Sequence, residues 1–441
     1  MEEKRTNARY FILVALFLVT VLNVTDRATL SVAAPAMKKA LKLDAMGLGI
    51  AFSAFGWSYT AMQVPGGWLL DKFGSRVVYA IGLFLWSFFT LLQGFAGFIS
   101  AGMGLMFLFI LRLLMGAAEA PAFPANSRLV AMWFPSQERG FAAAAFNSAQ
   151  YVTVAIFVPI MAWGVAAFGW SSMFFVTGAV GILVSFVWFN IIRDPKSHPW
   201  VNQAELDYIS AGGALAGLGE KKSDIKWSYV GALVRNRLMA GVYLAQYCIN
   251  AITWFFLTWF PSYLIEAKHM SLLKVGFAAS IPGIMGFCGG LLGGYWSDWL
   301  LRRGKTLTFA RKTPIILGLI FSSVIIVANY VQSVAVVIFV LAVAFFCKGL
   351  GSLGWSVVAD TSPKEMVGLS GGIFNMAGNV SGIITPLVIG YILKSTGSFH
   401  GALIFVGLHG IVGALSYLLI VGDIKRVQLN IQQPPATTAK A

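Results

Sequence analysis

GGWLLD, at residues 66–71, ends one long apolar run, and GGYWSD, at residues 293–298, ends another. A second match joins PSQERG at residues 135–140 to PKEMVG at residues 363–368, and seven residues beyond each of these loops comes an Asn within the dipeptide Phe-Asn. The partners in both matches are 227 or 228 residues apart. Because one offset serves two separate loops, we infer that the chain repeats itself as two similar halves.

The composition is that of a chain surrounded by lipid. Of its 441 residues, 58% are hydrophobic and 11% are charged, whereas a soluble domain is about 25% charged. So few charges cannot solvate the outside of a soluble globule. A helix that crosses a membrane needs roughly 20 mostly apolar residues. Twelve runs of that kind occur, near residues 10–33, 47–70, 78–98, 102–126, 139–165, 170–193, 236–265, 272–297, 312–331, 333–358, 366–393 and 399–422.

A single long polar connection divides these runs into six plus six. We therefore expect an all-α membrane protein of twelve transmembrane helices in two pseudo-symmetric six-helix bundles. The first bundle would cover residues 1–193 and the second residues 236–427, with a cytoplasmic linker at residues 194–235. The tail at residues 428–441 has no core-forming residues and should be disordered.

The positive charges predict the orientation. If the N-terminus is inside, 23 of the 32 Lys and Arg residues fall in cytoplasmic segments and six fall in loops on the outside. The other three lie well inside the apolar runs. Positive loops stay in the cytoplasm, so we expect both termini there, in a bacterial inner membrane. The same bias accounts for the net charge of +15, and we expect no nucleic-acid partner. The N-terminal segment lacks a small-residue cleavage site, so we expect no removable signal peptide.

Five charges lie away from the ends of the apolar runs and need a reason, because a charge at the bilayer centre costs about 2.5–3.5 kcal/mol on insertion scales. They are Asp26, Arg27, Arg112, Glu119 and Lys348. Asp26 and Arg27 are neighbours, and Arg112 and Glu119 are seven residues apart, which places them on one face of a helix. One interpretation is two ion pairs that only fasten helices together. The other is that the carboxylates load protons while the arginines hold an anion.

Lys348 stands alone in its run, with Asp360 about three turns away. It either pairs with Asp360, extends toward the membrane surface, or forms a second anion site opposite Arg27. A sugar diacid has a carboxylate at each end and would span two cationic walls. This reasoning favours an aldarate, galactarate or D-glucarate, as the substrate. An aldonate or hexuronate such as galactonate is the alternative, and an antiporter of organic anions is a further one.

Polar side chains in the runs are candidates to contact the hydroxyl groups of a sugar. Each could instead make a helix–helix hydrogen bond, worth about 0.6–2 kcal/mol. The candidates are Tyr59, Gln150, Asn250, Trp355 and Asn375.

Charged residues in the loops are candidates for a gate that closes the cytoplasmic side when the opposite side is open. Exposed ion pairs are weak, about 0–1 kcal/mol each, which suits contacts that break in every cycle. The candidates are Asp71, Arg76, Glu138 and Arg139 in one half and Asp298, Arg302 and Arg303 in the other.

Several of these stretches resemble a known family. DKFGSR at residues 71–76 is similar to the loop signature of the major facilitator superfamily. Finer matches resemble its anion:cation symporter branch, near bacterial galactonate, glucarate and galactarate transporters, and the resemblance runs from about residue 8 to 427. These matches are TDRA (25–28), FSAFGW (52–57), QVPGGW (63–68), EAPAFP (119–124) and VGDIKR (421–426).

The resemblance implies roles for individual residues. Asp26 and Glu119 would be the protonatable groups, and Arg27 would lie near the substrate carboxylate. Similar transporters often have a Tyr two residues before the helix-1 Asp, where this chain has Val24. The neighbouring Asn23 is expected to compensate for that hydroxyl group.

Other classes fit less well. The sequence shows no His/Cys cluster, HExxH or GxSxG, so we expect no enzyme, no metal and no cofactor apart from coupling protons. Pore-loop filter motifs are also missing, which argues against a channel. The expected partners are a small sugar-acid anion and the lipid bilayer, with the protein working as a monomer.

Overall fold

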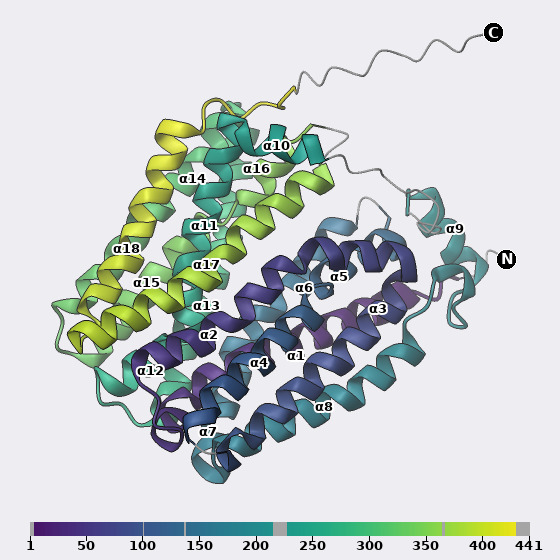
Figure 1. The fold of residues 1–441 in the computed structure, drawn as a ribbon. Coiled ribbons are helices and arrows are strands. Elements are labelled where there is room, and N and C mark those ends of the chain that lie inside the picture. The colour runs from purple at the N-terminus through teal and green to yellow at the C-terminus, as the bar shows by residue number, and fades with distance from the viewer. Residues whose placement is uncertain (1–3, 100, 136–137, 215–226, 364–366, 429–441) are drawn as a thin grey trace, which may run out of the picture.

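The computed structural model describes the chain except residues 1–3, 100, 136–137, 215–226, 364–366 and 429–441. The side chains of a few further helical residues, Asp71 and Arg139 among them, also lie outside the described part. Figure 1 shows that the described residues form helices, arranged as two bundles side by side. The expectation of an all-α membrane protein is confirmed for these residues.

The first bundle holds the helices of the N-terminal half: α1 (Ala8–Ala40), α2 (Ala45–Ala61), α3 (Gln63–Gln93), α4 (Ala101–Glu119), α5 (Ala122–Trp133), α6 (Arg139–Val152), α7 (Val158–Phe168) and α8 (Trp170–Ile191). Within α3 the chain turns back at Gly74, whose φ of 79° lies in the region that favours glycine. The part of α3 before Gly74 therefore continues α2, and the part after it is a separate crossing.

The linker carries α9 (Gln203–Ala211) and α10 (Trp227–Arg235). The second bundle holds α11 (Arg237–Thr258), α12 (Phe260–Glu266), α13 (Leu272–Arg302), α14 (Leu307–Ser322), α15 (Val334–Leu350), α16 (Gly354–Thr361), α17 (Val367–Thr396) and α18 (His400–Leu415).

Twelve crossings can be traced through these helices. Eleven segments are each long and apolar enough to cross a membrane, and α2 with the start of α3 supplies the twelfth. Several crossings consist of two helices in line, such as α4 with α5, which a break at Pro121 separates. A proline inside a helix removes one backbone hydrogen bond and bends the chain, so the length of these runs reflects bent helices.

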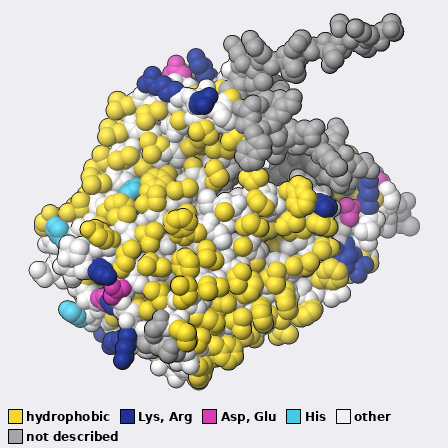
Figure 2. Space-filling view, viewed as in Figure 1, with side chains coloured by type: hydrophobic (Ala, Val, Ile, Leu, Met, Phe, Trp, Pro, Cys, Tyr) yellow, Lys and Arg dark blue, Asp and Glu magenta, His cyan; other side chains and the backbone are white. Residues whose placement is uncertain are grey.

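The surface is apolar between two charged ends. Figure 2 shows hydrophobic side chains across the middle of the molecule, with Lys, Arg, Asp and Glu gathered toward its ends. Large side chains such as Phe277, Leu291 and Leu419 are each at least 60% exposed. An apolar belt of this kind would be unstable in water and matches the hydrocarbon core of a bilayer.

The two bundles touch at one end and diverge toward the end that holds the chain termini (Figure 1). At the closed end Lys38 pairs with Glu266 at 2.8 Å, and Lys394 pairs with Asp44 at 2.9 Å. Helices α2 and α17 pack along each other there. A Cβ added to Gly49 would lie 2.7 Å from the carbonyl oxygen of Pro386, so these backbones approach too closely for any larger residue.

Helix α9 of the linker is attached to the start of α1 through Glu205. Its buried carboxylate accepts hydrogen bonds from the backbone N–H groups of Ala8 (2.8 Å) and Arg9 (3.2 Å), and from the Arg9 guanidinium (3.1 Å). Arg9 also pairs with Glu138 at 2.9 Å. The carboxylate therefore satisfies donors at the N-terminus of α1 that no helical carbonyl can reach, where a negative charge is also favoured by the helix dipole.

We expect Glu205→Ala to destabilise the N-terminal half by about 1–3 kcal/mol for each donor left unsatisfied, because the N–H groups of Ala8 and Arg9 lose their acceptor while the Arg9 guanidinium keeps Glu138. The apparent Tm of the purified transporter in detergent would measure the loss. Asp207→Ala is the matched control, since Asp207 is exposed on the same helix. Equal Tm values for the two variants would show that α9 does not hold α1.

The Glu138 carboxyl adds a pH dependence to this contact. Burial acts to raise its pKa, but hydrogen bonds from Arg9 and Tyr208 outweigh burial and hold the pKa below its ordinary value of 4.5. Its stabilising contribution is therefore complete above about pH 4.5 and is lost as the pH falls through the lower folded-state value. Thermal unfolding measured from pH 7 to pH 3 should show a smaller loss for Glu138→Gln than for the unchanged protein.

Candidate functional site

An ion pair joins α1 to α4 inside the first bundle. The Arg27 Nε lies 2.5 Å from Oε1 of Glu119, and Nη2 of Arg27 contacts the same oxygen. The Glu119 side chain is completely buried, and the Arg27 side chain is 11% exposed. Buried charges of opposite sign compensate each other's loss of hydration, so this pair is stable in a lipid-surrounded bundle until something competes for the arginine.

Three aromatic rings surround the Arg27 guanidinium. Its central carbon lies 4.7 Å from the ring centre of Phe55, 4.8 Å from that of Tyr59 and 5.9 Å from that of Phe123. Ring faces attract cations without supplying the hydrogen-bond acceptors that a guanidinium prefers. Arg27 therefore keeps capacity to bind an oxyanion. Tyr59, predicted only as a contact for sugar hydroxyl groups, thus lies beside Arg27.

Arg112 and Asp26 lie deeper in the same bundle. The Arg112 guanidinium is 5.3 Å from the ring of Phe55 and donates a weak hydrogen bond to the sulfur of Met115 at 3.7 Å. Asp26 lies near Trp86, Thr177 and Arg112. Its carboxyl group is close to these polar donors and forms no ion pair with a described residue.

Among the four charges of α1 and α4, the described contacts thus form one ion pair, where the fastening interpretation required two. Arg27 reaches across to Glu119, while Asp26 and Arg112 are close without pairing. All but Arg27 are at most 2% exposed, so these charges do not face lipid. The fastening interpretation required an ion pair for Asp26, and the described contacts give it none.

Lys348 is the charge that the sequence analysis placed inside an apolar run of the second bundle. It is 9% exposed on α15, and its Nζ lies 5.1 Å from the ring centre of Phe345. Asp360 instead pairs with Arg311 at 3.0 Å. Within the described part of the chain Lys348 forms no ion pair, so the interpretation in which it pairs with Asp360 is wrong for this conformation.

Four amide side chains gather between α11 and α17. Gln246 donates to Asn250 at 3.4 Å, and Asn379 donates to the side-chain oxygen of Asn375 at 3.2 Å. A Cβ added to Gly378 would lie 2.5 Å from Nδ2 of Asn250, so that amide packs directly on the α17 backbone. Asn250 and Asn375 were predicted from the sequence, whereas Gln246 and Asn379 were not. Each missed residue is four positions from a predicted one, a spacing that brings two side chains together on one face of a helix.

Two other candidates, Gln150 and Trp355, have exposed side chains. The Gln150 side chain is exposed and donates to the carbonyl of Asn147 at 3.1 Å, and the next residue, Tyr151, packs on Phe287 of α13 at 5.3 Å. Trp355 is 55% exposed and lies edge-on to Phe374. These positions leave both side chains accessible.

The aromatic ring that contacts both arginines also reaches the second bundle. Phe55 lies 6.4 Å from Trp254 of α11, and Asn250 is one turn before Trp254 on that helix. The Arg27 site is therefore separated from the amide cluster of the other half by one layer of aromatic side chains. Val24 is buried, and Asn23 lies beside Glu119.

The gate candidates pair within their own halves in this conformation. Glu138 pairs with Arg9, and Asp298 pairs with Arg311 at 3.2 Å. Arg76 donates to the carbonyl of Phe189 at 2.9 Å. The guanidinium carbon of Arg302 lies 5.7 Å from the ring of Tyr295. The side chains of Asp71 and Arg139 lie outside the described part, and pairing across the two halves stays a prediction for the opposite conformation.

Two bundles of membrane-crossing helices, with buried charges in both, define a polytopic membrane transporter. A family model described as Major Facilitator Superfamily matches residues 16–310. A probable galactarate/D-glucarate transporter of Escherichia coli (strain K12) is 55% identical over 434 residues, which cover 97% of this chain and 96% of that protein. A D-galactonate transporter of Escherichia coli O6:H1 (strain CFT073) is 43% identical, covering 95% and 97%.

A solved structure of a D-xylose-proton symporter has the same fold, with a TM-score of 0.73 at 16% identity over 94% of this chain and 98% of that one. The chain belongs to the Major Facilitator Superfamily. It is accordingly a transporter and not an enzyme.

Proposed function

We propose that this transporter carries a sugar-acid anion, an aldarate such as galactarate or D-glucarate, into the cytoplasm together with protons, by alternating access in a bacterial inner membrane. The observation that supports it most is the Arg27–Glu119 pair. It combines an oxyanion-binding cation with a protonatable group inside the membrane. The relative named for galactarate and D-glucarate is more similar than the one named for D-galactonate, which favours a diacid over a monoacid.

Exchange of partners at Arg27 supplies the coupling. A substrate carboxylate that binds the guanidinium competes with Glu119 for the same donors. Glu119 then accepts a proton, because a carboxylate that loses its cation partner in a buried site is costly. When the substrate leaves, Arg27 recovers Glu119 and the proton is released. Asp26, which is buried and forms no ion pair with a described residue, is a second position that can hold a proton.

The closed end of the molecule identifies the conformation under this proposal. If both termini are cytoplasmic, the ion pairs Lys38–Glu266 and Asp44–Lys394 lie on the outside. The structure then represents the inward-facing state. The outward-facing state requires these contacts to open and the loop charges of the two halves to approach each other.

Uptake of labelled galactarate, glucarate, galactonate and glucuronate into proteoliposomes tests the proposal. Uptake of the diacids should rise with an imposed inward proton gradient and collapse when an ionophore dissipates it. Counterflow without a pH gradient separates the antiporter alternative. Equal exchange with and without the gradient, and no gradient-driven accumulation, would rule out symport.

Lys348 provides the test of the diacid. We expect Lys348→Asn to lower the affinity for galactarate by about 10-fold to 100-fold, the range for losing a charge-assisted hydrogen bond of about 1.5–3 kcal/mol. Galactonate has no second carboxylate, so its transport should change much less. Competition by each acid against labelled galactarate measures both.

Lys348→Arg is the matched variant, because it keeps the charge on the same helix. It should retain most of the preference for the diacid. An equal loss for diacid and monoacid in Lys348→Asn would show that Lys348 supports the structure and does not contact the second carboxylate.

A further inference from the structure

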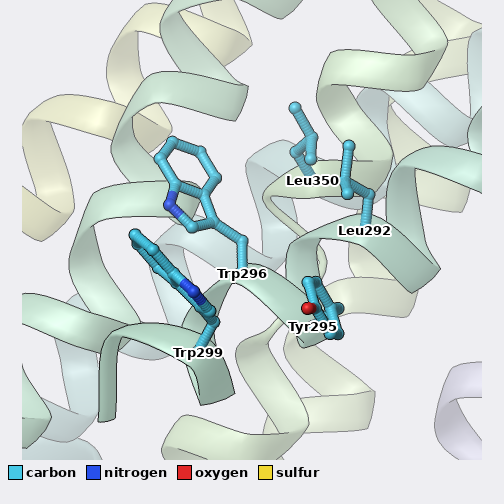
Figure 3. A pocket seen from close by; sticks show the side chains of 5 residues that line it. All are labelled: Leu292, Tyr295, Trp296, Trp299 and Leu350. Carbon is cyan, nitrogen blue, oxygen red and sulfur yellow. The ribbon is translucent and has the colours of Figure 1, made fainter. Parts of the chain in front are cut away.

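The proposed function leaves a group of aromatic side chains near the end of α13 unused. Leu292, Tyr295, Trp296 and Trp299 of α13, with Leu350 of α15, line a hollow of about 360 Å³. We call it the α13 pocket. Figure 3 shows the two indole rings on one side of it and the two leucines on the other. Its walls are almost entirely apolar, so it is unsuited to a small hydrophilic ligand.

The α13 pocket opens toward lipid. The exposed apolar side chains of α13 recur at helical spacing along one face of the helix: Phe277, Ile281, Ile284, Leu291 and Tyr295. A second face meets the first bundle, where a Cβ on Gly283 would lie 2.5 Å from Val154, and the face opposite the exposed residues packs on α15, where a Cβ on Gly293 would clash with the carbonyl oxygen of Leu350. Since Tyr295 continues the exposed face, the pocket belongs to the bilayer side of the molecule.

Two arginines border the α13 pocket at its polar end. The guanidinium carbon of Arg302 lies 5.7 Å from the ring of Tyr295, and that of Arg303 lies 4.4 Å from the ring of Trp299. Both arginines are exposed, and neither forms an ion pair with a described residue. The nearest acid on the same helix, Asp298, is already paired with an arginine of α14. The rim therefore carries uncompensated positive charge.

The depth of this rim in the membrane follows from its neighbours. The backbone N–H of Ile424 donates to Thr308 at 2.9 Å, which places the start of α14, and so the end of α13, beside the C-terminal segment. In the orientation of the proposed function this is the cytoplasmic surface. Trp and Tyr concentrate at membrane interfaces, and basic residues there attract anionic lipids by about 1 kcal/mol each.

We propose that the α13 pocket binds an anionic phospholipid of the cytoplasmic leaflet. An acyl chain lies against the indole rings and leucines, and the headgroup phosphate lies between Arg302 and Arg303. A zwitterionic lipid would fill the apolar part equally well but would gain less from the arginines. A free phosphate would use the arginines and none of the apolar walls. The combination of both features selects a lipid with a net negative headgroup.

Native mass spectrometry of the full-length transporter tests this directly, with phosphatidylglycerol and phosphatidylethanolamine titrated in turn. The unchanged protein should bind phosphatidylglycerol about 10-fold more tightly. The double variant Arg302→Gln, Arg303→Gln should bind both lipids equally. Its control is Lys39→Gln, Lys196→Gln, which removes two exposed charges away from the α13 pocket and should keep the preference.

A second pair of variants tests the apolar part. Leu292→Trp fills the α13 pocket and should lower phosphatidylglycerol binding about 10-fold, whereas Leu291→Trp, on the neighbouring exposed position, should not. Glycerol phosphate at millimolar concentration should fail to displace the lipid. If it displaces the lipid, or if all variants keep the preference, the proposal is wrong.

If Leu292→Trp does not fold, the arginine variants decide the question. Added phosphatidylglycerol should raise the Tm of the protein only when both arginines are present. Because binding is measured without transport, failure of this proposal is distinguishable from failure of symport.

Discussion

Glu119→Gln should abolish proton-driven accumulation of galactarate while substrate exchange continues. Glutamine has nearly the same shape as glutamic acid but cannot lose or gain a proton at neutral pH. Arg27 stays in its ring of Phe55, Tyr59 and Phe123 and is no longer held by a carboxylate. Binding of the anion should therefore persist and become independent of pH, and the imposed gradient should lose its effect.

Two measurements on the same preparation separate this result from a loss of folding. Counterflow of labelled galactarate at equal pH on both sides should stay near the unchanged level, while accumulation under a proton gradient falls to the ionophore level. Asp207→Asn, an exposed carboxylate in the linker, serves as the control and should behave as the unchanged protein. Gradient-driven accumulation that survives in Glu119→Gln would remove Glu119 from the coupling step.

Asp26→Asn offers an informative comparison with that variant. Asp26 is near Glu119 but holds no cation in an ion pair, so its loss should reduce proton-driven accumulation without freeing Arg27. The substrate affinity should then keep its dependence on pH.

The arrangement of membrane crossings was predictable because lipid imposes a length on every crossing helix. The repeat at residues 66–71 and 293–298 and the polar linker predicted two halves. Positions of breaks were harder to predict. The turn at Gly74 and the start of α3 at Gln63 depend on how α2 and α3 pack, and hydropathy averages over such breaks.

The candidate site was predictable in its residues and only partly in its pairing. A charge inside a membrane-crossing helix must be compensated, so Arg27 and Glu119 could be named from their positions in the apolar runs. Which carboxylate pairs with Arg27 depends on the rotation of α1 against α4. Glu119 is 92 positions further along the chain, so sequence spacing does not predict that pairing. The ring around Arg27 was missed because Phe55 and Phe123 are indistinguishable in sequence from core aromatics.

Arg27→Gln should remove substrate binding, with a loss of about 2–5 kcal/mol, or roughly 30-fold or more in Kd. The guanidinium is the group that the aromatic ring holds in place, and a neutral amide cannot replace its charge or its paired N–H donors. Galactarate and galactonate should suffer alike, because each presents a carboxylate to this site. That equal loss distinguishes Arg27 from Lys348, whose replacement should affect the diacid selectively.

Arg27→Lys tests whether charge alone is sufficient. Lysine keeps a cation against Phe55 and Tyr59 but offers a single ammonium group, so the bidentate contact with a carboxylate is lost. We expect affinity between that of Arg27→Gln and the unchanged protein, for both acids. Equilibrium binding to purified protein at a pH well above neutrality, where Glu119 competes most strongly, should show the largest difference. Undiminished binding of galactarate by Arg27→Gln would place the substrate carboxylate elsewhere, and the exchange of partners between Glu119 and the anion could not then couple the proton to transport.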